Sequence, residues 1–392
     1  MNFDTIINRK GTYCTQWDYI KDRFGVDDLI PFTISDMDFE APKEIIDAVM
    51  NRVNHKVFGY SRWNHDDFKD SIKLWYKKRF NFSINKEWIL YSPNVMYSVS
   101  NLIRMKSKTG DNVLIFTPVY DGFFKTIKAN NRNIITSALK KINNMYQIDF
   151  EDFEKKCLKS KILLFCSPHN PIGRVWTSDE LKRVVGICKM HNVYVISDEI
   201  HMDIVYNRHT PIFSINDYKN IALCSSPSKT FNISSLSSSY LLVRDNSDRE
   251  EFLYILKDRD SLSSPQILGI IASIEAYNKC DYWIDKALKY IENNIKYIIN
   301  YINKNIPDLK CYMPEGTYFT WIDYSNLNIS NKDFQKYLIN IGKVAIMDGI
   351  TYGEDGKFFI RINCACPMEK IKDCMNRINN TIEYIKSNHT IQ

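Results

Sequence analysis

Four side chains with complementary chemistry follow short apolar runs in the middle of the chain: Tyr120, Asn170, Asp198 and Lys229. They offer an aromatic ring, a carboxamide, a carboxylate and a primary amine. This combination matches what an aromatic aldehyde cofactor needs from a protein. The sequence therefore indicates a site for such a cofactor.

Each of these residues also has an ordinary structural interpretation. A lysine usually lies on the surface, and an aspartate at a strand end can cap the next helix. An asparagine beside proline is typical of a turn, and a tyrosine after proline is often a core residue. His201, three residues after Asp198, is typical by itself of a helix histidine with satisfied hydrogen bonds. The functional interpretation is favoured because the residues follow successive strands.

The apolar runs are rich in Ile, Leu and Val, which is typical of strands buried on both faces of a sheet. They lie at Val113–Phe116, Ile162–Cys166, Val193–Ser197, Ile221–Cys224 and Tyr240–Val243. Between the second and third runs, Thr177 and Glu180 form a capping box ahead of a helical pattern. This strand–helix–strand unit predicts a parallel sheet, and ligands bind such sheets beyond the carboxyl ends of the strands.

The composition is that of an ordinary globular protein with two domains. The chain has 392 residues, of which 44% are hydrophobic and 25% charged, and this length exceeds what one core usually serves. The net charge of +6 is dispersed, so we expect no nucleic-acid partner. We identify no signal peptide and no apolar stretch of membrane-spanning length, and expect a cytoplasmic protein without a membrane partner.

The ten cysteines are scattered without the spacing of a disulfide framework, which also favours a reducing, cytoplasmic compartment. Cys364 and Cys366 form a lone C-x-C motif without a second pair. We therefore predict no metal site, and the alternation of these two cysteines is typical of one face of a strand.

Helical patterns flank the predicted sheet. Pro42 opens a helix whose apolar face includes Ile46, and Asn94 precedes an amphipathic stretch that starts at Val95. A long helical pattern follows Ala287. We predict an α/β fold in which residues 46–284 form a large domain with a mostly parallel, mixed sheet flanked by helices. Residues 1–45 and 285–392 are predicted to form a smaller α/β domain.

Longer segments resemble a known family. SPHNPIGRVWT at 167–177, VISDEIHMDI at 195–204 and SSPSKTFNISSL at 225–236 resemble fold-type-I pyridoxal-5′-phosphate (PLP) enzymes of the aminotransferase class I/II superfamily. SDMDFEAP at 35–42, FGYSRW at 58–63, PEGTYFTWID at 314–323 and FFIRINCACP at 358–367 look like its cystathionine β-lyase branch, the C–S lyases of MalY/PatB type. The histidine of DEIH also favours that branch. The resemblance runs from about residue 10 to residue 380.

The resemblance implies a role for each residue around the cofactor ring. Lys229 would form a Schiff base with PLP and, once freed by the substrate, would move the Cα proton. Asp198 would keep the pyridine nitrogen protonated, and Asn170 would hydrogen-bond the phenolic oxygen. Tyr120 would stack on the ring, and His201 would support the ring or Asp198 from behind.

The resemblance also implies how the phosphate and the substrate are bound. Backbone N–H groups of Val95 and Met96 at a helix start would hold the phosphate, together with Ser226 and, as a weaker candidate, Ser228. Tyr60 would reach the phosphate from the neighbouring subunit of a homodimer and would join Lys229 and Tyr120 as a catalytic residue. The alternative for Tyr60 is a simple core tyrosine.

Arg361 matches the arginine that binds the substrate α-carboxylate, with Asn170 beside it. A planar guanidinium binds a carboxylate through two parallel hydrogen bonds. Arg361 stands among apolar neighbours on a predicted strand, where an unpaired charge is costly to bury, so a ligand partner is favoured over a structural salt bridge.

Three positions depart from the family pattern. Asn94 stands where the family usually has glycine, and asparagine tolerates a left-handed backbone better than most residues. Ser234–Ser235 replaces a pattern that usually contains glycine. Ser237 stands where many aminotransferases have an arginine that binds the phosphate, although the lyase branch also departs there.

The resemblance leads to three hypotheses for function. The first is β-elimination from cystathionine or a related cysteine S-conjugate, which gives a thiol such as homocysteine, pyruvate and ammonia. The second is an aminotransferase with the same cofactor. The third is a regulatory or binding protein that retains the PLP fold and engages a partner through its surface.

Overall fold

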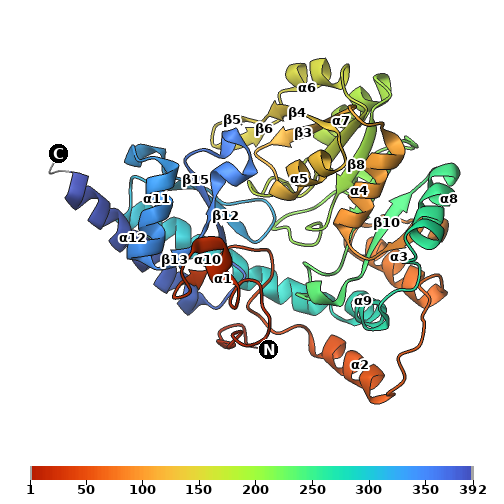
Figure 1. Ribbon diagram of the computed structural model, residues 1–392, viewed down its shortest axis with the longest axis horizontal. Coiled ribbons are helices and arrows are strands. Elements are labelled where there is room, and N and C mark those ends of the chain that lie inside the picture. The colour runs from red at the N-terminus through yellow and green to blue at the C-terminus, as the bar shows by residue number, and fades with distance from the viewer. Residues whose placement is uncertain (1, 390–392) are drawn as a thin grey trace.

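The computed structural model describes residues 2–389 and contains a large sheet of seven strands (Figure 1). In spatial order, these are β2 (Ile89–Ser92), β10 (Ser239–Val243), β9 (Ile221–Ser225), β8 (Tyr194–Asp198), β7 (Ile162–Cys166), β3 (Asn112–Thr117) and β4 (Asn133–Ala138). β10 is antiparallel to both of its neighbours, whereas every other adjacent pair is parallel. The predicted mostly parallel, mixed sheet is confirmed, and all five apolar runs are strands in it.

Helices pack around this sheet (Figure 1). They are α3 (Asp66–Phe80), α4 (Val95–Lys106), α5 (Asp121–Ala129), α6 (Phe150–Cys157), α7 (Ser178–Met190), α8 (Asn246–Tyr254) and α9 (Ile267–Lys279). α7 begins with the predicted capping box: the Glu180 N–H donates to Thr177 Oγ1 over 3.2 Å, and the Thr177 N–H donates to Glu180 Oε2 over 2.8 Å. This helix connects β7 to β8 and so completes the predicted strand–helix–strand unit.

α2 (Lys43–Asn54) begins directly after Pro42, as predicted, but its apolar residues do not all face the core. Ile45 is buried, whereas Ile46 is 45% exposed and Met50 is 52% exposed. The helix packs on α9. Part of the predicted apolar face is therefore open to solvent on the single chain.

A second, smaller sheet contains β11 (Lys310–Cys311), β12 (Phe319–Asp323), β15 (Phe359–Asn363) and β14 (Met347–Asp348), in this spatial order. Beside it, β1 (Ile30–Pro31) pairs in parallel with β13 (Val344–Ala345), so the N-terminal segment joins the C-terminal part of the chain. Further short elements are α1 (Ile20–Phe24), α11 (Asn331–Tyr337) and the hairpin of β5 (Lys140–Ile142) and β6 (Met145–Gln147). The β1–β13 pairing supports the proposed small domain of residues 1–45 and 285–392.

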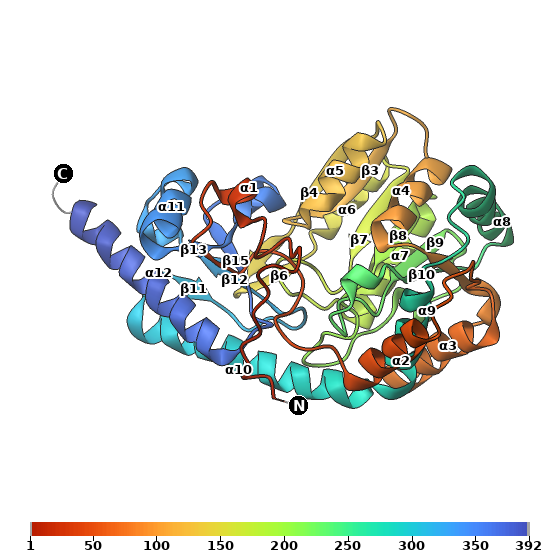
Figure 2. The same cartoon turned by 60° about the horizontal axis from the view of Figure 1, so that its bottom comes forward.

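The two sheets are connected by α10 (Asp281–Asn305), which Figure 2 shows as one long helix along a side of the molecule, with α12 (Met368–His389) beside its far part. Residue 285, the proposed domain boundary, lies inside α10. The helix continues through this position because buried residues recur at helical spacing on both sides of it, at Ile284, Ala287 and Ile291. No helix in residues 2–389 has the length and apolar character to cross a lipid bilayer.

Candidate active site

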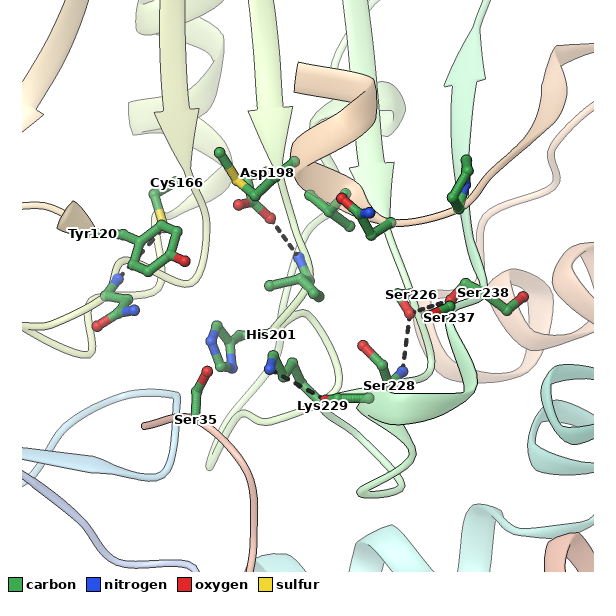
Figure 3. Close-up of a pocket in the computed structure, with 17 residues that line it drawn as sticks. Ser35, Tyr120, Cys166, Asp198, His201, Ser226, Ser228, Lys229, Ser237 and Ser238 are labelled. Carbon is green, nitrogen blue, oxygen red and sulfur yellow. Dashed lines mark hydrogen bonds between the residues drawn. The ribbon is translucent and has the colours of Figure 1, made fainter. Parts of the chain in front are cut away.

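A cavity of about 240 Å³ lies at the carboxyl ends of β3, β7, β8 and β9. Most of the predicted site residues line it: Tyr120, Asn170, Asp198, His201, Lys229, Val95, Met96, Ser226 and Ser228. Figure 3 shows Tyr120, Asp198, His201 and Lys229 around the same space, with Asp198 and His201 from one segment and the other two from separate loops. The topology places them together because the carboxyl ends of parallel strands meet at one edge of a sheet.

Lys229 lies in the loop after β9, and its side chain is half-buried. Its Nζ donates a hydrogen bond to Ser234 Oγ over 3.3 Å. Burial lowers the pKa of the Lys229 amine, and the charge of Arg361 acts in the same direction, while Asp36 and Asp198 oppose the shift. A lowered pKa leaves more of the amine unprotonated near neutral pH, and the unprotonated form is the one that acts as nucleophile and base.

Asp198 is the last residue of β8 and is buried. Burial raises the pKa of its carboxyl group to about 7, helped by the charge of Glu199 and opposed by the Ile200 N–H and by Lys229. The Ile200 N–H donates to Asp198 Oδ1 over 3.1 Å. A turn follows β8 rather than a helix, so the interpretation of Asp198 as a helix cap does not hold.

His201 lies in the same turn, so it is not a helix histidine. Burial lowers the pKa of its imidazole to about 3, and the charges of Lys229 and Arg361 lower it further. The ring packs edge-on against Tyr318, with centroids 5.4 Å apart. Its Nδ1 atom is buried and has no hydrogen-bond partner within the described part of the chain. His201 is therefore a neutral, polar wall of the cavity.

Arg361 lies on β15 and is buried. Its Nη1 donates to Asn170 Oδ1 over 2.9 Å, its Nη2 donates to the Thr33 carbonyl, and its guanidinium carbon lies 3.8 Å from the ring centroid of Phe319. Within residues 2–389 no carboxylate forms an ion pair with Arg361, and its Nε–H has no partner. The structural salt bridge is therefore not formed, and the guanidinium retains capacity for an anionic ligand.

The opposite end of the cavity begins at the start of α4, where Val95 and Met96 are the first two helical residues. Asn94 caps this helix: its Oδ1 accepts the Tyr97 N–H over 2.8 Å. Its φ of −157° is extended. Asn94 is therefore the N-cap residue of α4. The expectation that it stands in place of glycine because it tolerates a left-handed backbone is wrong.

Hydroxyl groups complete this end of the cavity. Ser226 Oγ donates to the Ser238 carbonyl over 2.6 Å and accepts the Ser228 N–H over 3.1 Å. Ser237, the serine in place of arginine, lines the cavity with a left-handed φ of 46°. Among the described residues of the cavity wall, Lys229 is the one lysine or arginine. Helix N–H groups and hydroxyls, rather than a guanidinium, are thus available to an anion here.

The two tyrosines differ in position. Tyr120 is half-buried, caps α5 and packs edge-on against Phe123, with ring centroids 5.9 Å apart. Tyr60 lies outside the cavity and is fully exposed. The alternative of a core tyrosine is therefore wrong for Tyr60.

Several cavity residues were not proposed as site residues from the sequence: Ser35, Cys166, Ser238 and Ser234, which was noted only as a departure from the family pattern. Ser234 and Ser238 are part of the small-residue loop around Lys229, a pattern that could have identified them. Cys166 is the last residue of β7, but its type resembles the other apolar residues of that strand. Ser35 comes from the N-terminal segment, and nothing in its neighbourhood in the sequence indicates proximity to Lys229. Three or more His, Cys, Asp or Glu side chains placed to bind a metal are absent from residues 2–389.

The chain is similar to known proteins over nearly its whole length. Residues 27–378 match the family model for aminotransferase class I and II. The chain is 43% identical over 391 residues to the protein MalY of Escherichia coli K12, covering 98% of this chain and 100% of MalY. It is 35% identical to the cystathionine β-lyase PatB of Bacillus subtilis 168, covering 96% of this chain and 99% of PatB.

Among solved structures, the PLP-bound C–S lyase of Staphylococcus hominis superimposes with a TM-score of 0.92 at 30% identity, covering 97% of this chain and 98% of that one. This likeness confirms the predicted fold of type-I PLP transferases. The agreement extends over both sheets and nearly the whole length. The chain is thus a member of the aminotransferase class I and II family.

Proposed function

We propose that the chain binds PLP through Lys229 and catalyses β-elimination from cystathionine or a related cysteine S-conjugate, giving a thiol, pyruvate and ammonia. The observation that carries this proposal is one cavity with an amine and a buried carboxylate in its wall, and beside it the guanidinium of Arg361, which is hydrogen-bonded to the cavity residue Asn170 but forms no ion pair within the described residues. PatB is a cystathionine β-lyase by name, and the Staphylococcus hominis protein, which shares this fold, is a C–S lyase by name.

The residues present fit PLP on their own chemistry. A cofactor with a pyridine nitrogen gives Asp198 the cationic partner that a carboxylate with a pKa raised to about 7 lacks. Free N–H groups at the start of α4 and the surrounding hydroxyls suit a phosphate dianion. Lys229 stands between these two ends of the cavity wall, where an aldehyde would meet its amine.

When bound, PLP supplies an electron sink for negative charge at the substrate Cα. Lys229 would accept the Cα proton, a role to which its lowered pKa is suited. Arg361, backed by Asn170 and the Thr33 carbonyl, would orient the α-carboxylate through its remaining N–H groups. Tyr120 and His201 would limit the access of water to the reacting carbon.

Aminotransferase activity is the second candidate, and the family model itself favours it. The same side chains around the cofactor serve both reactions, because both begin with removal of the Cα proton. The reactions differ in the co-substrate: transamination requires a keto acid, whereas β-elimination from a thioether does not.

We also propose that the chain forms a homodimer in which Tyr60 reaches the neighbouring subunit's cavity. Exposed apolar residues on α2 and in the segment that leads from it to Tyr60 support this assembly: Ile46, Met50, Val53, Val57 and Phe58. A reducing, cytoplasmic location is proposed as well, supported by ten cysteines that are all present as free thiols.

The test of the main proposal supplies cystathionine alone to the purified full chain in the presence of PLP. Release of pyruvate and free thiol is expected, together with an imine absorbance band that Lys229→Ala abolishes. Lys125→Ala is the matched control, since Lys125 is an exposed lysine on α5 and its loss leaves both signals unchanged. Turnover that requires an added keto acid would replace the lyase proposal with the aminotransferase.

A further inference from the structure

A segment of the N-terminal region lies between the lysine and the arginine of the proposed site. This segment, residues 33–38, is called the strap below. Its Ser35 lines the same cavity as Lys229, and Figure 3 shows Ser35 beside Lys229 and His201. The strap belongs to neither of the two sheets, yet hydrogen bonds fix it on both sides.

On the lysine side, the strap is held by Asn232, three residues after Lys229. Asn232 Oδ1 accepts the Met37 N–H over 2.9 Å, and Asn232 Nδ2 donates to the carbonyls of Met37 and Phe39 over 3.0 and 2.8 Å. The side-chain amide of Asn232 thus uses both its oxygen and its nitrogen on one short stretch of backbone. Asn232 has a left-handed φ of 56°, a conformation that asparagine and glycine adopt readily.

On the arginine side, the strap is held by Asn363, two residues after Arg361. Asn363 Nδ2 donates to the carbonyls of Ile34 and Asp36, each over 2.7 Å. Arg361 itself donates to the Thr33 carbonyl. Tyr318, which packs on His201, donates its hydroxyl to the Ser35 carbonyl over 2.8 Å. Four successive carbonyls of the strap, from residue 33 to residue 36, therefore accept hydrogen bonds from the small-sheet side.

The strap also brings a charge toward the amine. One carboxylate oxygen of Asp36 pairs with Arg9, while the other is buried without a partner in the described part of the chain. The charge of Asp36 raises the pKa of Lys229 against the effect of burial, as Asp198 does from the carboxyl end of β8. The position of the strap therefore bears on the electrostatics of the amine as well as on its location.

We propose that the strap sets the separation between Lys229 and Arg361, and that Asn232 and Asn363 are the positioning residues that hold its two sides. This inference rests on the proposed function, in which Lys229 and Arg361 act on one substrate. Substrate carboxylate binding and proton transfer at Cα need a fixed spacing, because small displacements of reacting groups reduce rates strongly. Neither asparagine touches the cavity itself.

The experiment compares Asn232→Gly, Asn363→Ala and the double variant in the full chain with PLP. Glycine at position 232 removes three hydrogen bonds without straining the left-handed backbone. Asn131→Gly is the matched control: Asn131 has a φ of 58°, is exposed and has no side-chain hydrogen bond to the strap. Unfolding temperatures of all variants identify any general loss of stability.

Each single variant is expected to lower kcat/KM for cystathionine by about tenfold or more, and the double variant by no more than the worse single variant. Non-additivity is expected because release of either side frees the same strap. Two independent structural effects would add instead. Additive losses, or single variants within about twofold of the wild type, would overturn the proposal.

A second measurement does not depend on cofactor or substrate. Backbone hydrogen exchange of the cofactor-free full chain is followed in peptides that cover residues 33–38 and 226–232. Asn363→Ala is expected to accelerate exchange in both peptides, although it contacts only the first. If exchange near Lys229 is unchanged, the strap does not connect the two sides. If Asn363→Ala accelerates exchange in both peptides but the wild type shows no turnover, the proposed function is refuted and the proposal for the strap stands.

Discussion

Asp198 and His201 stand three residues apart in one turn, and burial shifts their pKa values in opposite directions. A buried environment disfavours charge, so it raises the pKa of the carboxyl group to about 7 and lowers that of the imidazole to about 3. His201 therefore stays neutral across the physiological range, whereas Asp198 titrates within it. A cationic ring nitrogen next to Asp198 would restore the ionised form.

This difference predicts how stability depends on pH in the cofactor-free protein. The pKa of Asp198 is raised on folding from 3.8 to about 7, so the unfolded chain releases this proton first and stability falls as pH rises between these values. Asp198→Asn removes the effect. Relative to the variant, the wild type should lose on the order of 4 kcal/mol between pH 4 and pH 7, measured by urea unfolding. Parallel pH profiles for the two proteins would contradict the buried, raised carboxyl group.

A second residue-scale prediction concerns Arg361. Arg361→Lys keeps the positive charge but loses the planar pair of donors, and it also loses the bond to Asn170. The KM for an amino-acid substrate is expected to rise by about tenfold to a hundredfold, with a smaller change in kcat. Steady-state kinetics measure this split. Arg208→Lys, at an exposed arginine, is the control, and an unchanged KM in Arg361→Lys would remove the carboxylate-binding role.

At the level of elements, α4 shows how a departure from the family pattern is accommodated. Asn94 caps the N-terminus of α4 by accepting a hydrogen bond from the Tyr97 N–H, while Val95 and Met96, the first two helical residues, line the cavity end. The helix start is stabilised by a side chain that glycine lacks.

We therefore predict that Asn94→Ala lowers the free energy of unfolding by about 1 kcal/mol, and that Asn94→Gly lowers it by only a few tenths. Both variants should still bind PLP, because the backbone donors of α4 are unchanged. Chemical unfolding and a PLP absorbance titration measure the two effects separately. Equal loss of PLP affinity and stability in Asn94→Gly would show that the asparagine side chain itself contacts the anion.

The sequence was sufficient to predict those strands and helices whose apolar residues form a clear run or recur at helical spacing. β7, β8 and β9 are continuous apolar runs, so their ends located Asn170, Asp198 and Lys229 correctly. β4 was not predicted, because this edge strand is largely exposed and lacks an apolar run. β2 was not predicted either, because its apolar run ends after Tyr91.

The rest of the site depends on long-range contacts that leave no local pattern. The strap contributes mostly backbone carbonyls, which every residue possesses, so residue types could not identify it. Likewise, Tyr60 could be interpreted as a core residue until the fold showed it fully exposed. Backbone contacts and exposure follow from tertiary packing, which a single sequence does not display.

For the whole molecule, the exposed apolar face of α2 and the loop after it support the prediction that each subunit contributes Tyr60 to the site of the other. If Tyr60 acts in the partner's cavity, each site takes Lys229 from one chain and Tyr60 from the other. Tyr60→Ala and Lys229→Ala then damage the contributions of two different chains to a site. Mixed dimers of the two variants would then contain one complete site and one doubly defective site. Refolding an equal mixture is expected to restore about a quarter of the wild-type sites.

Pyruvate release from the refolded mixture measures this restoration, and each variant refolded alone is the control. No recovery in a mixture that forms dimers would place the action of Tyr60 within its own chain.

Full exposure of Tyr60 on the single chain also connects activity to abundance. Under the proposed assembly, complete sites form by mass action, so their number rises more steeply than the amount of protein at low concentration. Output per molecule would fall on dilution even though every chain remains folded. At low expression, the total activity would thus fall by a larger factor than the concentration of the protein.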